Sequence, residues 1–265
     1  MTTLATSGLS LSLGGVPILR GVDAQFAAGQ VAALIGPNGA GKSSLMACLA
    51  GLRMPGAGSV TLDGVDRGAI DRRALARRIG YLPQTPEVHW DVDVATLVAL
   101  GRFAHQDRWA GASAQDRAAV ADAMAITDVT ALAARRIGTL SGGERARVLL
   151  ARVLAGAPEW LLADEPLANL DPAHQLDALA CLRRVAEAGA GVVVVLHDLN
   201  HAARVADAVM VMQAGTIIAS GPPDTVLTAD VIARTYGVEA EVGTAVDGSR
   251  IIVALARHRE RASDA

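Results

Sequence analysis

Leucine and serine alternate over residues 9–13, so apolar and polar side chains recur with a period of two. This period is typical of a strand that buries one of its faces. Gly14 and Gly15 predict a turn, and residues 16–26 predict a second strand. After a segment rich in proline and glycine, residues 59–62 predict part of a further hairpin. We therefore expect an antiparallel β subdomain near the N-terminus.

Three other runs are apolar throughout, at residues 31–35, 160–163 and 192–196. Such runs predict strands that are buried on both faces, as in a parallel sheet covered by helices. Helical spacing follows them, for example over residues 172–188, and a last hairpin is expected near residues 238–254. The pattern predicts an α/β fold with a mainly parallel sheet.

Between these strands, from about residue 87 to residue 156, strand signals stop and an alanine-rich helical pattern takes over. Ser113 and Asp116 have the spacing of a capping box, which marks the start of a helix. We predict an inserted helical subdomain at 87–156. Residues 1–86 and 157–265 would then form the core together with the β subdomain, in a single domain of 265 residues.

Composition narrows the class of protein. Hydrophobic residues make up 51% of the chain and aromatic residues only 3%, which predicts one substantial core of aliphatic side chains. A net charge of −3 and the lack of a long basic run argue against nucleic acid as the main partner. No signal peptide or bilayer-length apolar run is found, so we expect a cytoplasmic protein. Cys48 and Cys181 fit no metal spacing and are expected to be buried.

The first apolar run leads into a loop that fits the phosphate-binding pattern of Gly, four residues, Gly, Lys and then Ser or Thr. Its residues are Gly36, Pro37, Asn38, Gly39, Ala40, Gly41, Lys42 and Ser43. Glycines let backbone N–H groups point at a phosphate, and the next helix directs its positive end at the same anion. Lys42 is the only lysine, since the other 23 of the 24 basic residues are arginine. An ordinary glycine-rich turn is the alternative.

Charged residues follow the other two apolar runs. Asp164 and Glu165 come after residues 160–163, and His197 comes after residues 192–196. Because the carboxyl ends of parallel strands meet at one edge of a sheet, we expect these side chains to lie near the phosphate loop. One carboxylate can hold Mg²⁺ while the other orients an attacking water, and the histidine can contact a γ-phosphate. Without the loop, a surface acidic pair and a core histidine would be the simpler interpretation.

A second anion-binding element is predicted at Ser141, Gly142, Gly143 and Glu144, which open a helix. Ser141 and Glu144 have the spacing of a capping box, and the two glycines leave backbone amides uncovered. An ordinary helix cap is again the alternative.

Together these motifs resemble those of ABC-transporter ATPase subunits. The matching positions are the phosphate loop, Gln84, residues 140–144, residues 160–166, Asn169, Leu170, Asp171 and His197. The match covers nearly the whole chain. The resemblance implies a P-loop NTPase core, ATP as the substrate and Mg²⁺ as the cofactor.

The resemblance also implies a role for each site residue. Lys42 and the loop up to Ser44 would hold the phosphates of the nucleotide. Ser43, Gln84 and Asp164 would serve Mg²⁺, Glu165 would polarise water, and His197 would sense the γ-phosphate. Residues 141–144 would bind the nucleotide of a second copy in a head-to-tail dimer, with Asp171 bridging between the two sites.

Partners follow from the same resemblance. Gln84 would begin the loop that senses integral membrane permease subunits, which places the chain at the cytoplasmic face of the inner membrane. The family usually has an aromatic residue stacking on adenine where this chain has Leu13, and threonine where it has Leu167.

The class of transporter is indicated by residues 98–102, His105 and residues 164–175, which are similar to importer ATPases for ferric siderophores, haem and cobalamin. Such importers imply a separate substrate-binding protein. An exporter or another importer remains an alternative. So does a soluble ABC ATPase, although those generally carry two cassettes or a long coiled-coil insertion. A P-loop kinase or GTPase would not need residues 140–144.

Overall fold

The computed structural model describes residues 2–84, 91–106, 111–168, 170–246 and 248–257. Its central sheet has six strands in the order β10-β9-β3-β8-β7-β6. β10 is antiparallel to β9, and the other pairs are parallel. The strands are β3 (Val31–Ile35), β6 (Ile79–Leu82), β7 (Trp160–Asp164), β8 (Gly191–Val195), β9 (Ala208–Gln213) and β10 (Thr216–Gly221). The predicted α/β class with a mainly parallel sheet is confirmed.

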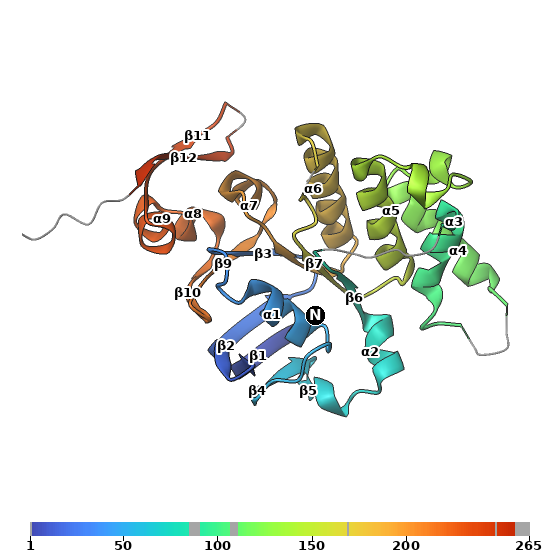
Figure 1. Ribbon diagram of the computed structural model, residues 1–265, viewed down its shortest axis with the longest axis horizontal. Coiled ribbons are helices and arrows are strands. Elements are labelled where there is room, and N and C mark those ends of the chain that lie inside the picture. The colour runs from blue at the N-terminus through green and yellow to red at the C-terminus, as the bar shows by residue number, and fades with distance from the viewer. Residues whose placement is uncertain (1, 85–90, 107–110, 169, 247, 258–265) are drawn as a thin grey trace, which may run out of the picture.

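A second sheet has four strands in the order β2-β1-β4-β5, and all of its pairs are antiparallel. Its strands are β1 (Thr3–Leu13), β2 (Val16–Ala27), β4 (Ala57–Leu62) and β5 (Val65–Asp66). The predicted N-terminal β subdomain is confirmed, and its first strand begins earlier than the alternating residues indicated. In Figure 1 this sheet and α1 lie on one side of the central sheet, and α6 and α7 lie on the other.

Helices form much of the remaining described chain. They are α1 (Lys42–Leu49), α2 (Arg72–Arg78), α3 (Val94–Ala99), α4 (Ala114–Ile126), α5 (Gly142–Ala155), α6 (Pro172–Glu187), α7 (Leu199–Val205), α8 (Pro223–Val226) and α9 (Ala229–Tyr236). Short 3₁₀ turns are η1 (Arg67–Ala69), η2 (Leu100–Arg102), η3 (Thr130–Leu132) and η4 (Ile137–Thr139). Among the described residues, no helix combines the length and the apolar character needed to cross a bilayer.

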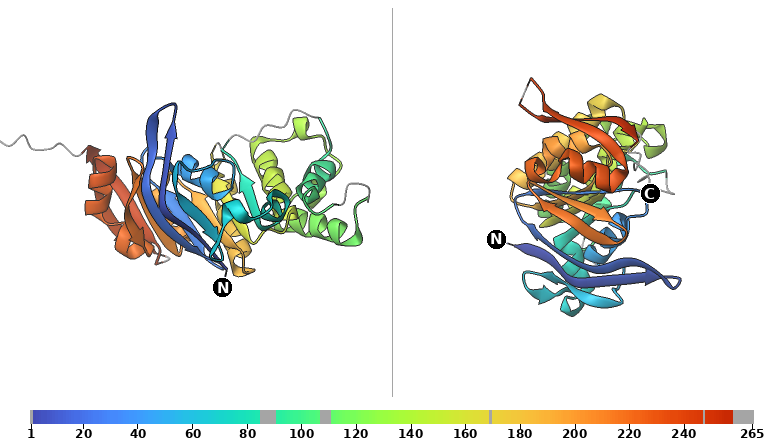
Figure 2. Two further views of the ribbon diagram at one scale, coloured as in Figure 1. Left: turned by 90° about the horizontal axis from the view of Figure 1, so that it is seen from below. Right: turned by 90° about the vertical axis from the view of Figure 1, so that its left-hand side faces the viewer.

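The predicted helical region is built from α3, α4 and α5, which stand together beside β6 at one end of the molecule (Figures 1 and 2). The capping box of Ser113 and Asp116 is present at the start of α4. Residues 87–90, where the region was predicted to begin, lie outside the described residues. The division into a core and a helical subdomain stays a prediction.

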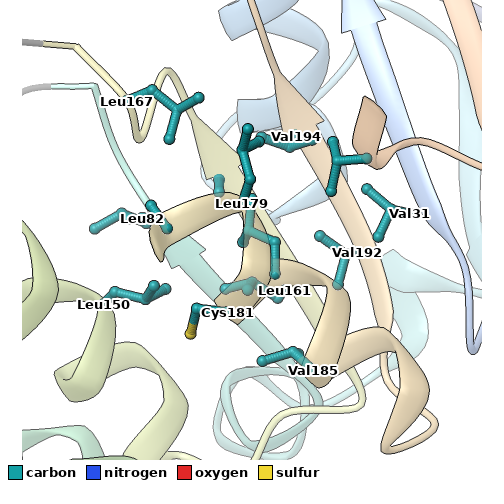
Figure 3. Close-up of a cluster of buried hydrophobic side chains, with 14 of the residues drawn as sticks. Val31, Leu82, Leu150, Leu161, Leu167, Leu179, Cys181, Val185, Val192 and Val194 are labelled. Carbon is teal, nitrogen blue, oxygen red and sulfur yellow. The ribbon is translucent and has the colours of Figure 1, made fainter. Parts of the chain in front are cut away.

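The hydrophobic core lies on both faces of the central sheet. Val31 and Ala33 of β3 belong to one cluster, and Leu34 belongs to the other, because neighbouring side chains of a strand point to opposite faces. The first cluster includes Cys181 and packs the sheet against α5 and α6 (Figure 3). Cys48 is buried in the second. The absence of polar positions in these strands therefore follows from burial on both sides.

A two-stranded hairpin of β11 (Val238–Thr244) and β12 (Arg250–Arg257) follows α9. It is fastened to α7 by the side-chain amide of Asn200. The Ile252 backbone N–H donates to Asn200 Oδ1 at 2.8 Å, and Asn200 Nδ2 donates to the Ile252 carbonyl at 3.3 Å. β12 is therefore hydrogen-bonded to α7, the helix that follows β8 in the chain.

Candidate active site

The predicted phosphate loop connects β3 to α1 and has a backbone that only glycine can supply at two points. Gly36 has φ 143°, and a Cβ there would lie 2.1 Å from the Met212 carbonyl oxygen. Gly41 has φ 100°, and a Cβ there would lie 2.9 Å from a methyl carbon of Leu19. The loop therefore needs glycine for its conformation and for the close approach of neighbouring chain.

Lys42, at the start of α1, turns its side chain back into this loop. Its Nζ donates to the carbonyl oxygens of Gly36 at 2.7 Å and Pro37 at 3.0 Å. The residue is only 5% exposed. Burial lowers the pKa of the Lys42 ammonium, and the nearby carboxylates of Glu165 and Asp164 oppose that effect. The ammonium therefore already lies inside the loop, bonded to two of its carbonyl oxygens.

Asp164 ends β7 beside the first turn of α1. The Ser43 hydroxyl donates to Asp164 Oδ1 at 3.2 Å, and the Tyr81 hydroxyl donates to Oδ2 at 3.5 Å. Asp164 is only 2% exposed, and this burial raises the pKa of its carboxyl. Burial and the Asp164 charge raise the pKa of Tyr81 to about 12, so that phenol stays a donor. A hydroxyl and a carboxylate side by side are hard oxygen ligands that fit Mg²⁺.

Glu165 is turned away from its neighbour by a backbone φ of 53°. Gln84 Nε2 donates to Glu165 Oε2 at 2.6 Å, and His197 Nε2 lies 2.6 Å from Glu165 Oε1. The Glu165 side chain is 15% exposed and that of His197 is 48% exposed. The two adjacent carboxylates therefore have different partners, because Asp164 bonds to Ser43 and Tyr81. Glu165, which follows β7, is therefore in contact with one residue that follows β6 and one that follows β8.

These side chains surround an open cavity of about 630 Å³. Its lining consists of Ile18, Asn38, Gly39, Ala40, Gly41, Lys42, Ser43, Ser44, Gln84, Glu165 and His197. Lys42 and Ser43 are in turn bonded to residues that do not line the cavity themselves, namely Gly36, Pro37 and Asp164.

Two contributions were missed in the sequence. Ile18 of β2 gives the cavity an apolar wall, and Tyr81 of β6 supports Asp164. Leu13, the position expected at adenine, does not line the cavity and packs at the edge of the second core cluster. No local pattern marks Ile18, because its place depends on how β2 packs against the loop. Tyr81 could have been noticed, since it lies on the strand that precedes Gln84.

The second predicted element is a helix cap, as its spacing indicated. Ser141 Oγ accepts from the Glu144 N–H at 3.2 Å, and Glu144 Oε2 accepts from the Ser141 N–H at 2.7 Å. The Arg135 guanidinium also contacts Glu144, at 2.9 Å. Hydrogen bonding to Ser141, and after it the charge of Arg135, lowers the pKa of Glu144. None of the residues 141–144 lines the cavity.

Asp171 also lies away from the cavity, at the N-cap of α6. Its Oδ1 accepts from the His174 N–H at 3.0 Å, and its Oδ2 lies 2.8 Å from His174 Nδ1. These bonds from His174 lower the pKa of Asp171. Asn169, which belonged to the same motif, lies outside the described residues. A single chain thus brings together the residues of the loop, Gln84, Glu165 and His197, but not residues 141–144 or Asp171.

Comparison with known proteins identifies a family whose members this chain resembles. Residues 19–168 match the family described as ABC transporter. The chain is 44% identical over 249 residues to the hemin import ATP-binding protein HmuV of Bordetella parapertussis, covering 91% of this chain and 94% of that protein. It is 42% identical over 243 residues to the cobalamin import ATP-binding protein BtuD of Halobacterium salinarum, covering 91% of this chain and 61% of that protein.

Solved structures agree on the fold. A metal-chelate type ABC transporter in an inward-facing conformation superposes with a TM-score of 0.83, covering 96% of this chain and 97% of that one. The sequence identity of that pair is 24%, so the likeness concerns the fold alone.

Proposed function

This chain belongs to the ABC transporter family as an ATP-hydrolysing subunit coupled to transport, and from that premise we propose that it drives import of an iron chelate, haem or cobalamin. Separate integral membrane permease subunits would carry the cargo. The names of the hemin and cobalamin relatives support this cargo class. An exporter, an importer of another cargo, and a non-transport ATPase are the competing functions.

The observation that supports ATP hydrolysis as the driving reaction is the meeting of Lys42, Gln84, Glu165 and His197 at one cavity. Lys42 would bind phosphate oxygens at the N-terminus of α1. Ser43 and Asp164 would hold Mg²⁺, which neutralises charge on the phosphates when bound.

Glu165 is the proposed base. The bonds from Gln84 and His197 fix its carboxylate toward the cavity, where it can accept a proton from an attacking water. His197, half exposed at the cavity, can also donate to a terminal phosphate. Gln84 would transmit the presence of the terminal phosphate to the permease, because it begins the segment that we expect to contact the permease.

We further propose that two copies pair head to tail. The start of α5 offers uncovered amides, since a Cβ on Gly142 would meet no atom within 4 Å. The start of α5 does not line the cavity of the same chain, so the anion that it fits is a nucleotide bound to a second copy. Asp171 would bridge the two sites. The assembly would sit at the cytoplasmic face of the membrane, fed by a substrate-binding protein and with no nucleic-acid partner.

The test is transport by the reconstituted complex. The chain is co-purified with its permease, the bound small molecule is identified, and vesicles are assayed for ATP-driven uptake of haem, cobalamin or a ferric siderophore. The matched control is Glu165→Gln, which keeps the shape of the side chain and removes the base. The proposal is supported if vesicles that carry the native chain take up one of these cargoes and vesicles that carry Glu165→Gln do not. Outward transport would overturn it, and so would an active ATPase that co-purifies with no permease.

A further inference from the structure

The two glycines at the start of α5 have different surroundings within the chain. A Cβ on Gly142 would meet nothing within 4 Å. A Cβ on Gly143 would lie 3.0 Å from Nδ1, 3.1 Å from Cγ and 3.3 Å from Cδ2 of His174. The imidazole ring of α6 therefore lies against the backbone of Gly143. A side chain at position 143 would therefore clash with a neighbour in the same chain, and a side chain at position 142 would not.

His174 cannot easily move aside, because Asp171 holds it at two points. The Asp171 carboxylate accepts from the His174 N–H at 3.0 Å and lies 2.8 Å from its Nδ1. A carboxylate only accepts hydrogen bonds, so Nδ1 of His174 is the donor in this contact. The backbone N–H and the ring of His174 are therefore both bonded to the same side chain.

These contacts join two elements that are far apart in the sequence. α5 belongs to the predicted helical subdomain, and α6 belongs to the predicted core; Figure 1 shows the two helices as neighbours. His174 touches the start of α5 with its ring face and Asp171 with its ring edge. A shift of either element relative to the other would strain the ring contact or the hydrogen bond.

We propose that His174 is a positioning residue that fixes Asp171 and the start of α5 in one relative position. The inference rests on the proposed pairing of two copies, in which both elements face the partner's nucleotide. If the two elements present a single preformed surface, each nucleotide meets Ser141 and Asp171 of the partner in one geometry. Loss of the ring would leave both elements folded but free to shift independently.

The packing itself is tested without nucleotide, by thermal unfolding of four proteins: the native chain, Gly143→Ala, His174→Ala and the double variant. In the native background, the added methyl group should lower Tm by roughly 2–4 °C. In the His174→Ala background, the same change should leave Tm equal or higher, because alanine favours a helix over glycine. Gly142→Ala is the matched control, and its effect should be the same in both backgrounds. If Gly143→Ala changed Tm equally in both backgrounds, the proposed contact between His174 and Gly143 would be wrong.

Function is tested by steady-state ATP hydrolysis in the complete transporter. His174→Ala should lower kcat by roughly tenfold or more, because small displacements of positioned groups are costly to rate. The Kd of the isolated chain for ATP should not change, since His174 does not line the cavity. His174→Gln should recover much of kcat, because its amide N–H can donate to Asp171.

The two levels of failure can be told apart. A native transporter that hydrolyses no ATP would refute the proposed function, while the unfolding cycle would still decide the contact. Native ATPase activity combined with an unchanged kcat in His174→Ala would refute the positioning role alone.

Discussion

Lys42 donates to the loop carbonyls of Gly36 and Pro37, which it would leave for a nucleotide. We predict that Lys42→Arg lowers ATP turnover by roughly 10²-fold or more, although the charge is kept. The planar guanidinium cannot enter the space between the two carbonyl oxygens as a slender ammonium does. The measurement is steady-state phosphate release, and near-normal turnover would contradict the role given to Lys42.

The same residue offers a chemical readout, because it is the only lysine in the chain. An amine-reactive reagent should modify Lys42 and the N-terminal amine alone, and ATP should slow the reaction at Lys42. Mass spectrometry of the labelled peptides checks this. Equal labelling of Lys42 with and without ATP would show that the nucleotide does not reach its ammonium.

Asp164 provides a prediction on pH. Burial raises the pKa of its carboxyl in the folded chain above the ordinary 3.8, so the folded state binds protons more tightly than the unfolded state. The free energy of unfolding therefore falls as pH rises through the folded-state pKa. Asp164→Asn should raise the stability of the nucleotide-free chain at pH 7, by about 1 kcal/mol.

The gain from Asp164→Asn should shrink as pH is lowered toward 3.8, where the native carboxyl is protonated as well. Thermal unfolding across this range, without Mg²⁺ or nucleotide, is the measurement. A gain that does not depend on pH would assign the effect to packing. ATP turnover should fall in the same variant, since an uncharged amide at this position could not neutralise Mg²⁺.

Among the elements, α7 depends on a contact from outside its own segment. Asn200→Ala removes both hydrogen bonds to Ile252 and should release β12 from α7. Hydrogen exchange at the β12 amides should become faster, and kcat for ATP should fall, because α7 begins two residues after His197. Asn200→Asp keeps the acceptor for the Ile252 N–H and loses the donor, so its exchange rates should be intermediate. Unchanged exchange in Asn200→Ala would show that the hairpin is held by its other contacts, such as apolar packing and the ion pair of Arg250 with Asp224.

Individual elements could be predicted where the signal is local. Five-residue apolar runs gave β3 and β8, and the spacing of Ser141 and Glu144 gave the start of α5, because burial and capping act within a few residues. The place of Ile18 at the cavity depends on packing between segments, which leaves no periodic trace in the sequence. The contact of His174 with Gly143 was missed for the same reason. The loop and the residues that follow the strands could be placed together, because parallel strands present their carboxyl ends at one edge.

For the whole molecule, the prediction concerns pairing. Glu165→Gln should block hydrolysis while leaving Mg²⁺ to Asp164, and should therefore trap a dimer in ATP but not in ADP. The reason is that residues 141–144 lie outside their own cavity and fit an anion on a second copy. Light scattering at tens of micromolar protein is the measurement. A strict monomer with bound ATP would count against head-to-tail pairing.

The matched control for that experiment is the further change Ser141→Arg. Its long side chain would occupy the position of the partner's phosphate, and it also removes the cap of α5. The trapped dimer should disappear, while ATP binding to the single chain should persist. A dimer that survives this change would have to form through another surface.

The two hydrogen bonds between Asn200 and Ile252 also have a consequence for the order in which the chain is synthesised. It joins positions 52 residues apart, and β12 is the last strand that the structure describes. A ribosome therefore releases the loop, Glu165 and α7 well before it releases the strand that fixes α7. A nascent chain, or one cut by a protease ahead of β12, would hold every residue of the cavity and lack that support. We expect such a chain to bind ATP without turning it over efficiently, so that ATP is not consumed before synthesis has passed the hairpin.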